Sequence, residues 1–264
     1  MTTTDTGPTA RLDLTGLLRS ELIKARGLRS IQWLLALIVA LPIVISVLTV
    51  TTSDAAAGTH EELTALALST VSGTNWIPLL LVLMLGTIVA TAEYERGAVQ
   101  MTFTVAPRRT AVVLAKAILV GVTSLVATFL PAVVAYLLAA ALLGGDDPAT
   151  LGDPDVLRVI TGTALYAASA GVIAMCFGFL TRSSIGAVTA TIGFLYAVPA
   201  LLQAIPVEAV GWFARTIPGP ASTPLELPGH PEGDLTFTTA LIAIVLWTAA
   251  ALLLTCAVVR RRDV

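Results

Sequence analysis

Six long apolar stretches constrain the fold of this chain more than any other feature. A transmembrane helix needs about 20 mostly apolar residues, each of which adds ~1.5 Å. The stretches are Ile31–Val50, Trp76–Thr91, Val112–Leu143, Val156–Leu180, Ile185–Ile205 and Phe237–Val259. With 12% charged residues and a mean hydropathy of +0.89, the chain lies outside the usual range of soluble domains. The sequence therefore predicts an all-α integral membrane protein with six transmembrane helices.

The lengths of these stretches predict some details of the spans. Trp76–Thr91 is the shortest, and Gly73–Trp76 can extend it outward. Val112–Leu143 is too long for one straight crossing, so its first turns around Lys116 are expected to project into the cytoplasm, with a kink at Pro131. The loop Thr181–Ser184 is short enough to predict a tight antiparallel pair of the fourth and fifth spans.

The distribution of basic residues predicts the orientation. With the N-terminus inside, only Arg158 and Arg215 lie outside, so thirteen of the fifteen Lys and Arg residues obey the positive-inside rule. The outer segments instead carry acidic residues, among them Asp54, Glu61, Glu62, Asp146, Asp147, Asp153 and Asp155. We therefore expect both termini to be cytoplasmic, in a multi-pass protein of the cell (plasma) membrane.

A segment before the first span has the pattern of an amphipathic helix. In Leu14–Arg29, apolar residues recur every three or four positions, and Arg19, Glu21, Lys24 and Arg26 fall between them. This pattern predicts a helix that lies in the membrane interface with its basic side chains toward lipid phosphates. The alternative is an ordinary basic flank that serves the orientation rule alone.

Several features typical of self-sufficient transporters and enzymes are missing from the sequence. No span carries an ionisable residue near its middle, as proton or ion coupling would need, and no phosphate-binding loop GxxxxGK[ST] occurs. His60 is interpreted as a solvated residue of an outer loop, and Cys176 and Cys256 as small side chains within apolar spans. We therefore expect a protein that is not an enzyme and has no catalytic residue, cofactor or metal site. Any energy for uphill transport must come from another chain.

The connection after the second span, residues 92–116, is expected to be structured. It begins with Glu93, Tyr94, Glu95, Arg96 and Gly97, a mixture of charges that the orientation rule alone does not require. The segment as a whole fits two short helices joined by a turn near Ala106 and Pro107. The alternative is a solvated helix end whose charges simply stop the span. For Arg108 and Arg109, anchoring at the membrane surface is favoured over contact with a partner.

The outer segment Ile205–Pro231 contains Gly and Pro and is expected to form short helices that dip back toward the membrane. A plain extracellular loop is the alternative.

The order of several motifs resembles the ABC-2 type transporter permeases, most closely those of actinobacteria. The motifs are Glu93-Tyr94-x-x-Gly97, Thr102, Thr104, Pro107-Arg108-Arg109 and Lys116, the basic segment Glu21–Leu35, the segment Gly211–Pro218, and the tail Arg260-Arg261-Arg262-Asp263. The stretch Gly219-Pro220-Ala221-Ser222 departs from the Ser-Asn-Ala-Gly-like turn of many relatives. The resemblance extends over nearly the whole chain.

This resemblance implies a permease subunit that pairs with a second permease copy, as a homo- or heterodimer, and with cytoplasmic ABC ATPase subunits. Its implied parts are a cytoplasmic tail and lead-in helix (1–30), a transmembrane domain (31–259) with a coupling loop (92–116) and an outer loop (206–235), and a basic tail (260–264). The implied ATPase-coupling residues are Glu93, Tyr94, Glu95, Arg96, Gly97, Arg108 and Arg109. The expected partners also include membrane lipids, and no nucleic acid.

Two function classes compete with an exporter of hydrophobic or amphipathic substrates. The first is a non-transporting membrane subunit, for immunity or sensing, that recruits an ATPase. The second is a membrane-embedded lipid-modifying enzyme, which the lack of any acid/base or metal constellation disfavours.

Overall fold

The computed structural model of the chain describes residues 14–52, 60–72, 76–95, 109–143, 153–226 and 235–261. All regular secondary structure within these ranges is helical. Six helical stretches of the described chain are long and apolar enough to cross a membrane: Arg29–Thr52, Ala65–Ala92, Thr110–Leu143, Pro154–Thr181, Ser184–Gln203 and Phe237–Arg261. The predicted all-α class and its six spans are therefore confirmed.

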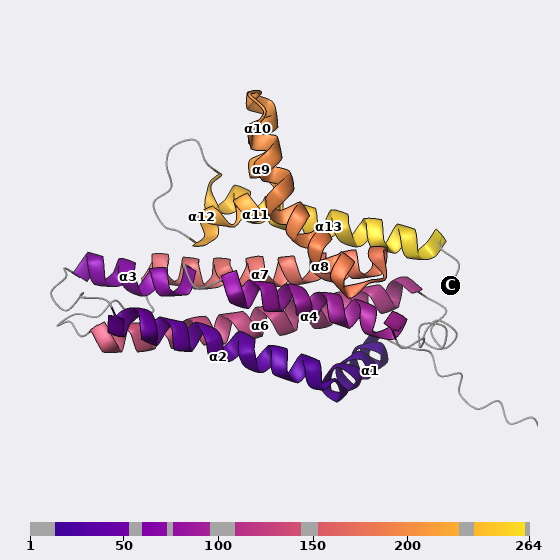
Figure 1. Cartoon of the computed structure of the whole chain (residues 1–264), viewed down its shortest axis with the longest axis horizontal. Helices are drawn as coiled ribbons and strands as arrows, with labels where there is room; N and C mark the ends of the chain where they lie inside the picture. Colours follow the sequence, from indigo (N-terminus) through magenta and orange to yellow (C-terminus); the bar gives the residue numbers. More distant parts are fainter. Residues whose placement is uncertain are drawn as a thin grey trace, which may run out of the picture.

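Helix α7 (Pro154–Thr181) forms the centre of the bundle. Figure 1 shows α2 (Arg29–Thr52), α4 (Trp76–Glu95), α6 (Arg109–Leu143) and α13 (Phe237–Arg261) extending along the same axis as α7. Of these, α4, α6 and α13 pack directly on α7, whereas α2 packs on α6 and α4. Most side chains of α7 are buried, and many are Gly, Ala, Ser or Thr. Small residues at such positions let neighbouring helix backbones approach closely, which is how helices associate in membranes.

Two glycine contacts set the approach of α4 to α7. A Cβ atom at Gly86 would overlap the carbonyl oxygen of Gly171, and one at Gly178 would lie 2.6 Å from the Cβ atom of Ala90. Both contacts therefore require the absence of a side chain. Because they lie about one turn apart along α4 and about two turns apart along α7, they fix the direction of α4 as well as its distance from α7.

The second apolar stretch begins earlier than the sequence indicated. Helix α3 (His60–Ser72) lies ahead of α4, so His60 starts a helix and the interpretation of His60 as a loop residue is wrong. The reason is an amphipathic pattern with Ala67, Leu68, Thr70 and Val71 buried on one face. On that face the Ser46 hydroxyl of α2 lies 3.0 Å from both Thr70 Oγ1 and the Ala135 carbonyl oxygen of α6, and its single proton is shared between these two acceptors. The hydroxyl residues of α3 therefore lie in a helix that packs against its neighbours, and not in a loop.

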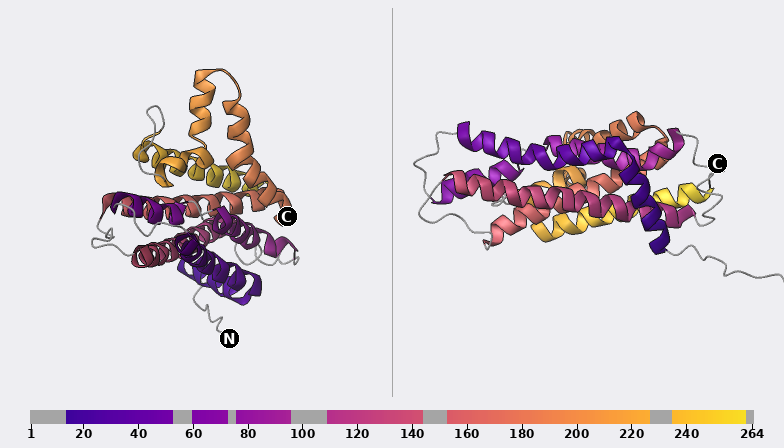
Figure 2. Two further views of the ribbon diagram at one scale, coloured as in Figure 1. Left: turned by 60° about the vertical axis from the view of Figure 1, so that its left-hand side comes forward. Right: turned by 90° about the horizontal axis from the view of Figure 1, so that it is seen from below.

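The fifth span packs closely along the fourth only at its start. Farther along, Tyr196 reaches Tyr166 of the fourth span through its side chain. Helix α8 (Ser184–Ile192) packs against α7, but the span continues through a π-helical turn, η1 (Gly193–Ala197), into α9 (Val198–Gln203). Figures 1 and 2 show α9 standing away from the long helices, beside α10 (Glu208–Arg215). The prediction of a tight antiparallel pair is therefore wrong beyond α8, because the π-helical turn and Pro199 interrupt the regular helix.

The described part of the segment before the last span, residues 205–226, contains three short helices, in agreement with the prediction of short helices there. After α10, α11 (Pro218–Ala221) and α12 (Thr223–Glu226) lie against the bundle. A Cβ atom at Gly219 would overlap the carbonyl oxygen of Leu195 in η1, and one at Gly162 of α7 would lie 2.5 Å from the carbonyl oxygen of Leu225. Direct backbone contact thus holds both α11 and α12 in place. Residues 227–231 of the predicted segment lie outside the described residues.

Candidate functional site

The predicted coupling residues flank the junction between α4 and α6. Glu93, Tyr94 and Glu95 form the last turn of α4, and Arg109 is the first residue of α6. Arg96, Gly97 and Arg108 lie outside the described residues, as does the predicted turn near Ala106 and Pro107. The two helices pack on each other. The structure therefore places four of the seven predicted residues on two adjacent helices, at the ends that lead into one connection.

A buried ion pair lies directly beneath this junction. Lys116 of α6 and Glu21 of α1 (Leu14–Gly27) are 2.6 Å apart between Nζ and Oε2, and each side chain is only 3% exposed. Lys116 Nζ also donates a hydrogen bond to the carbonyl oxygen of Val89 in α4, at 3.1 Å. The second carboxylate oxygen of Glu21 accepts from Lys24 at 2.8 Å. One lysine thus joins three helices: α1, α4 and α6.

The position of this cluster relates it to the predicted coupling residues. Val89 lies four residues before Glu93, and Lys116 lies seven residues after Arg109. At ~1.5 Å per residue, the ion pair lies about 6 Å along α4 from Glu93 and about 10 Å along α6 from Arg109. A displacement of either helix end therefore changes the geometry around Lys116.

This cluster corrects two expectations. Lys116 does not project from the bundle, and Glu21 is not part of an exposed polar face of α1, because each ion is buried against the other. The helix itself is confirmed within one or two residues, and Arg19, Lys24 and Arg26 are exposed. Since a buried charge is costly unless it is paired and hydrogen-bonded, pairing explains why both side chains turn inward.

The sequence did contain a signal for this pair. Lys116 is the one charged residue after Arg109 in α6, and Glu21 is the one acidic residue of α1. A lone lysine near the end of an apolar helix, together with a lone acid in a basic one, is a pattern that predicts mutual pairing. Spacing along the chain could not reveal it, because 95 residues separate the two.

A further contact ties the end of α4 to the start of the fifth span. Thr91 Oγ1 and Ser184 Oγ lie 2.5 Å apart. Ser184 follows a tight turn in which Arg182 adopts a left-handed conformation and donates its N–H to Gly178, while Ser183 caps α8 by accepting from Gly186. The same end of α4 is therefore joined to α1, α6 and α8.

Residues 17–200, from α1 into α9, match the family described as ABC-2 family transporter protein. The chain belongs to this family. The matched region contains Glu21, the end of α4 and Lys116, and therefore the whole cluster beneath the junction. No curated protein matches the chain.

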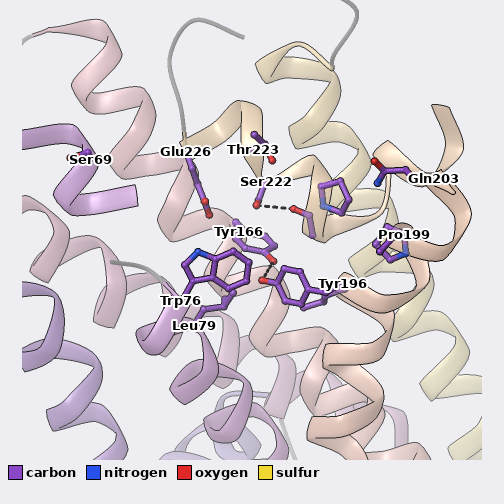
Figure 3. Close-up of a pocket in the computed structure, with 14 residues that line it drawn as sticks. Ser69, Trp76, Leu79, Tyr166, Tyr196, Pro199, Gln203, Ser222, Thr223 and Glu226 are labelled. Carbon is purple, nitrogen blue, oxygen red and sulfur yellow. Dashed lines mark hydrogen bonds between the residues drawn. The ribbon is translucent and has the colours of Figure 1, made fainter. Parts of the chain in front are cut away.

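In this ABC-2 family protein, an open cavity of about 640 Å³ lies toward the opposite end of the bundle (Figure 3). Its walls come from α3, α4, α7, η1, α9, α11 and α12. Volumes of 300–1,000 Å³ are typical of small-molecule sites. The Tyr166 and Tyr196 hydroxyl groups are hydrogen-bonded at 3.0 Å, and the Tyr196 ring lies 5.1 Å from that of Trp76 between centroids. This cavity was not predictable from the sequence, because its wall residues are far apart along the chain.

Proposed function

We propose that this chain is the membrane subunit of an ATP-binding cassette exporter of a hydrophobic or amphipathic substrate, driven by a separate cytoplasmic ATPase subunit. The observation that carries the proposal is the buried cluster of Glu21, Lys116 and the Val89 carbonyl group, which joins both helices of the α4–α6 junction to α1. A soluble motor needs such a mechanical connection at the membrane surface. Membership in the ABC-2 family supports the membrane-subunit role.

The acidic end of α4 supports a docking role for this junction. A helix C-terminus carries a partial negative charge, so acidic side chains there are unfavourable by about 0.3–1 kcal/mol each. The last turn of α4 nevertheless contains Glu93 and Glu95 and no basic residue. Basic side chains of a partner would compensate both the carboxylates and the helix dipole. We assign Glu93, Tyr94, Glu95, Arg96 and Gly97 to this contact, with Arg108 and Arg109 at its membrane side.

In the proposed mechanism, two copies of the chain pair with two ATPase subunits. Closure of the ATPases on ATP pushes the α4–α6 junction, and the rigid link through Lys116 passes the movement to α1, α4 and α6 together. The contact between Thr91 and Ser184 passes it on to the fifth span. The substrate moves outward as the helices of the two copies part.

Reconstitution tests the exporter function. The tagged chain is purified from its native membranes in mild detergent together with any co-purifying ATP-binding subunit, and both are placed in liposomes. ATP-dependent movement of hydrophobic dyes across the bilayer is then measured. An ATPase that binds without any transport would instead support the non-transporting immunity or sensing subunit, and would count against the exporter.

Reversing the charges at the end of α4 is expected to abolish docking. In the double variant Glu93→Lys/Glu95→Lys, like charges face the basic side chains proposed on the ATPase, so recovery of the ATPase with the tagged chain falls at least about tenfold. Stimulation of ATP hydrolysis by the permease falls in parallel. The control is Arg261→Glu, which changes an exposed charge at the end of α13. Equal recovery of ATPase in both variants would contradict the docking role.

Cysteine labelling tests the proposed orientation in the cell membrane. After replacement of Cys176 and Cys256 by alanine, single cysteines are introduced at the exposed residues Ala209 of α10 and Arg261 of α13. With both termini cytoplasmic, a membrane-impermeant maleimide labels Ala209→Cys in intact cells and Arg261→Cys only after permeabilisation. The reverse pattern would invert the topology and place the α4–α6 junction out of reach of a cytoplasmic ATPase.

A further inference from the structure

The cavity in Figure 3 has aromatic side chains from three different spans on one side. Trp76 starts α4, Tyr166 is in α7 and Tyr196 is in η1. Trp76 is 61% exposed, so much of its ring is open to a ligand. The hydrogen bond between the two tyrosine hydroxyl groups fixes the Tyr196 ring against the indole of Trp76. Fixed aromatic faces attract cations placed within ~6 Å of the ring centre.

The π-helical turn presents Tyr196 to this cavity. Within η1, Leu195 is fully buried and its carbonyl oxygen touches Gly219 of α11, and both Leu195 and the next residue, Tyr196, line the cavity. π-Helical turns inside α-helices are rare and occur frequently at functional sites. This one brings two consecutive residues to the cavity wall.

An acidic residue faces the aromatic side of the cavity. Glu226 of α12 lines the cavity and points toward the Trp76 and Tyr166 rings in Figure 3. Among the described residues that line the cavity, Glu226 is the one charged side chain, and the remainder are aromatic, aliphatic, hydroxyl, Gly, Pro or amide residues. A carboxylate beside electron-rich rings disfavours anionic ligands and favours positive ones.

The net charge of the predicted outer segments also favours a positively charged ligand. The segments that the predicted orientation places outside carry eleven acidic residues against two basic ones, Arg158 and Arg215. The acidic residues are Asp54, Glu61, Glu62, Asp146, Asp147, Asp153, Asp155, Glu208, Glu226, Glu232 and Asp234. Such a field raises the local concentration of cations near the cavity and lowers that of anions.

We propose that this cavity binds a hydrophobic cation, an amphiphilic amine or quaternary ammonium or phosphonium compound, and that such compounds are the substrate class of the transporter. Its apolar part contacts Leu79 and Pro199, and its charge lies between the Trp76 ring and the Glu226 carboxylate. That these compounds are transported substrates rests on the proposed function. Their binding to the cavity does not depend on an ATPase.

Two probes of the same shape and opposite charge test the inference. The full chain is placed in nanodiscs of phosphatidylcholine, and binding of tetraphenylphosphonium and tetraphenylborate is measured by equilibrium dialysis, with empty nanodiscs subtracted. We expect saturable binding of tetraphenylphosphonium and none of tetraphenylborate. Equal binding of both ions would overturn the charge selectivity.

Matched substitutions locate the bound probe. Glu226→Gln and Trp76→Leu are each expected to weaken tetraphenylphosphonium binding about tenfold, while Trp76→Phe retains most of it because an aromatic face remains. The controls Glu208→Gln and Trp212→Leu change an acid and an exposed Trp of α10 that do not line the cavity, and are expected to leave binding unchanged. Thermal unfolding of each variant verifies folding. Unchanged binding in both folded variants, Glu226→Gln and Trp76→Leu, would exclude this cavity.

The outcome separates the two proposals. Selective binding to the chain without ATP-driven transport in the reconstituted complex would retain the site and overturn the exporter function. ATP-driven transport of neutral or anionic dyes without tetraphenylphosphonium binding would retain the exporter and overturn the cation site.

Discussion

Replacement of Lys116 by methionine is expected to destabilise the folded protein by about 3–5 kcal/mol, because it leaves the Glu21 carboxylate buried without its closest partner. Methionine retains most of the length of the lysine side chain, so the change isolates the loss of charge. Lys24 remains beside the other carboxylate oxygen and places the expected value toward the lower end of this range. Thermal unfolding in detergent measures the loss.

Two further variants test whether the loss of stability in Lys116→Met comes from the buried ion pair. Lys24→Met removes the partly exposed member of the cluster, whose side chain is 44% exposed, and is expected to cost less than about 1 kcal/mol. The double variant Glu21→Gln/Lys116→Met removes both buried charges and is expected to recover most of the stability. If Lys116→Met proves as mild as Lys24→Met, the buried pair does not hold α1 to the bundle.

The double variant also separates structure from function. If the pair only stabilises the fold, Glu21→Gln/Lys116→Met restores ATP-dependent transport along with stability. If the pair carries movement from the junction to α1, stability returns while transport per ATP hydrolysed stays low. We expect the second result.

The second large effect is expected at Gly86, where α4 crosses α7. Even one added methyl group would overlap the carbonyl oxygen of Gly171, which belongs to a helix backbone and cannot rotate away. Overpacking of this kind typically costs 1–3 kcal/mol, and backbone contact places Gly86→Ala at about 3 kcal/mol. Gly86→Leu is expected to give no folded protein in detergent.

Gly121 of α6 provides the matched control. A Cβ atom there would lie 3.5 Å from a side-chain methyl group of Val172, an ordinary contact. Gly121→Ala is therefore expected to be neutral or to stabilise by up to about 1 kcal/mol, because alanine restricts the unfolded chain. Equal unfolding temperatures for Gly86→Ala and Gly121→Ala would contradict the close helix crossing.

Hydropathy predicted the long helices well, because it depends only on a local property of the sequence. The bounds of α2, α7 and α13 differ from the predicted spans by at most two residues at either end. The prediction was wrong for α3, whose hydroxyl residues look polar in the sequence but find partners on neighbouring helices.

Features that depend on partners far along the chain were not predictable from periodicity. The departure of α9 from α7 depends on a π-helical turn fixed by the backbone contact with Gly219, and the burial of Glu21 depends on Lys116. The cavity unites Trp76, Tyr166 and Tyr196 in the same way. The proposed partner of the candidate coupling residues is a separate chain, so no contact within this chain could reveal it.

The ion pair between Glu21 and Lys116 also implies an order of events during biosynthesis. Because 95 residues separate the two, α1 emerges from the ribosome and meets the membrane long before α6 exists. Glu21 must then remain at the lipid headgroups, where water solvates its carboxylate, and α1 docks only after α6 has been inserted. We therefore expect α1 to dock only after α2 and α4 have entered the membrane, although it is synthesised before both.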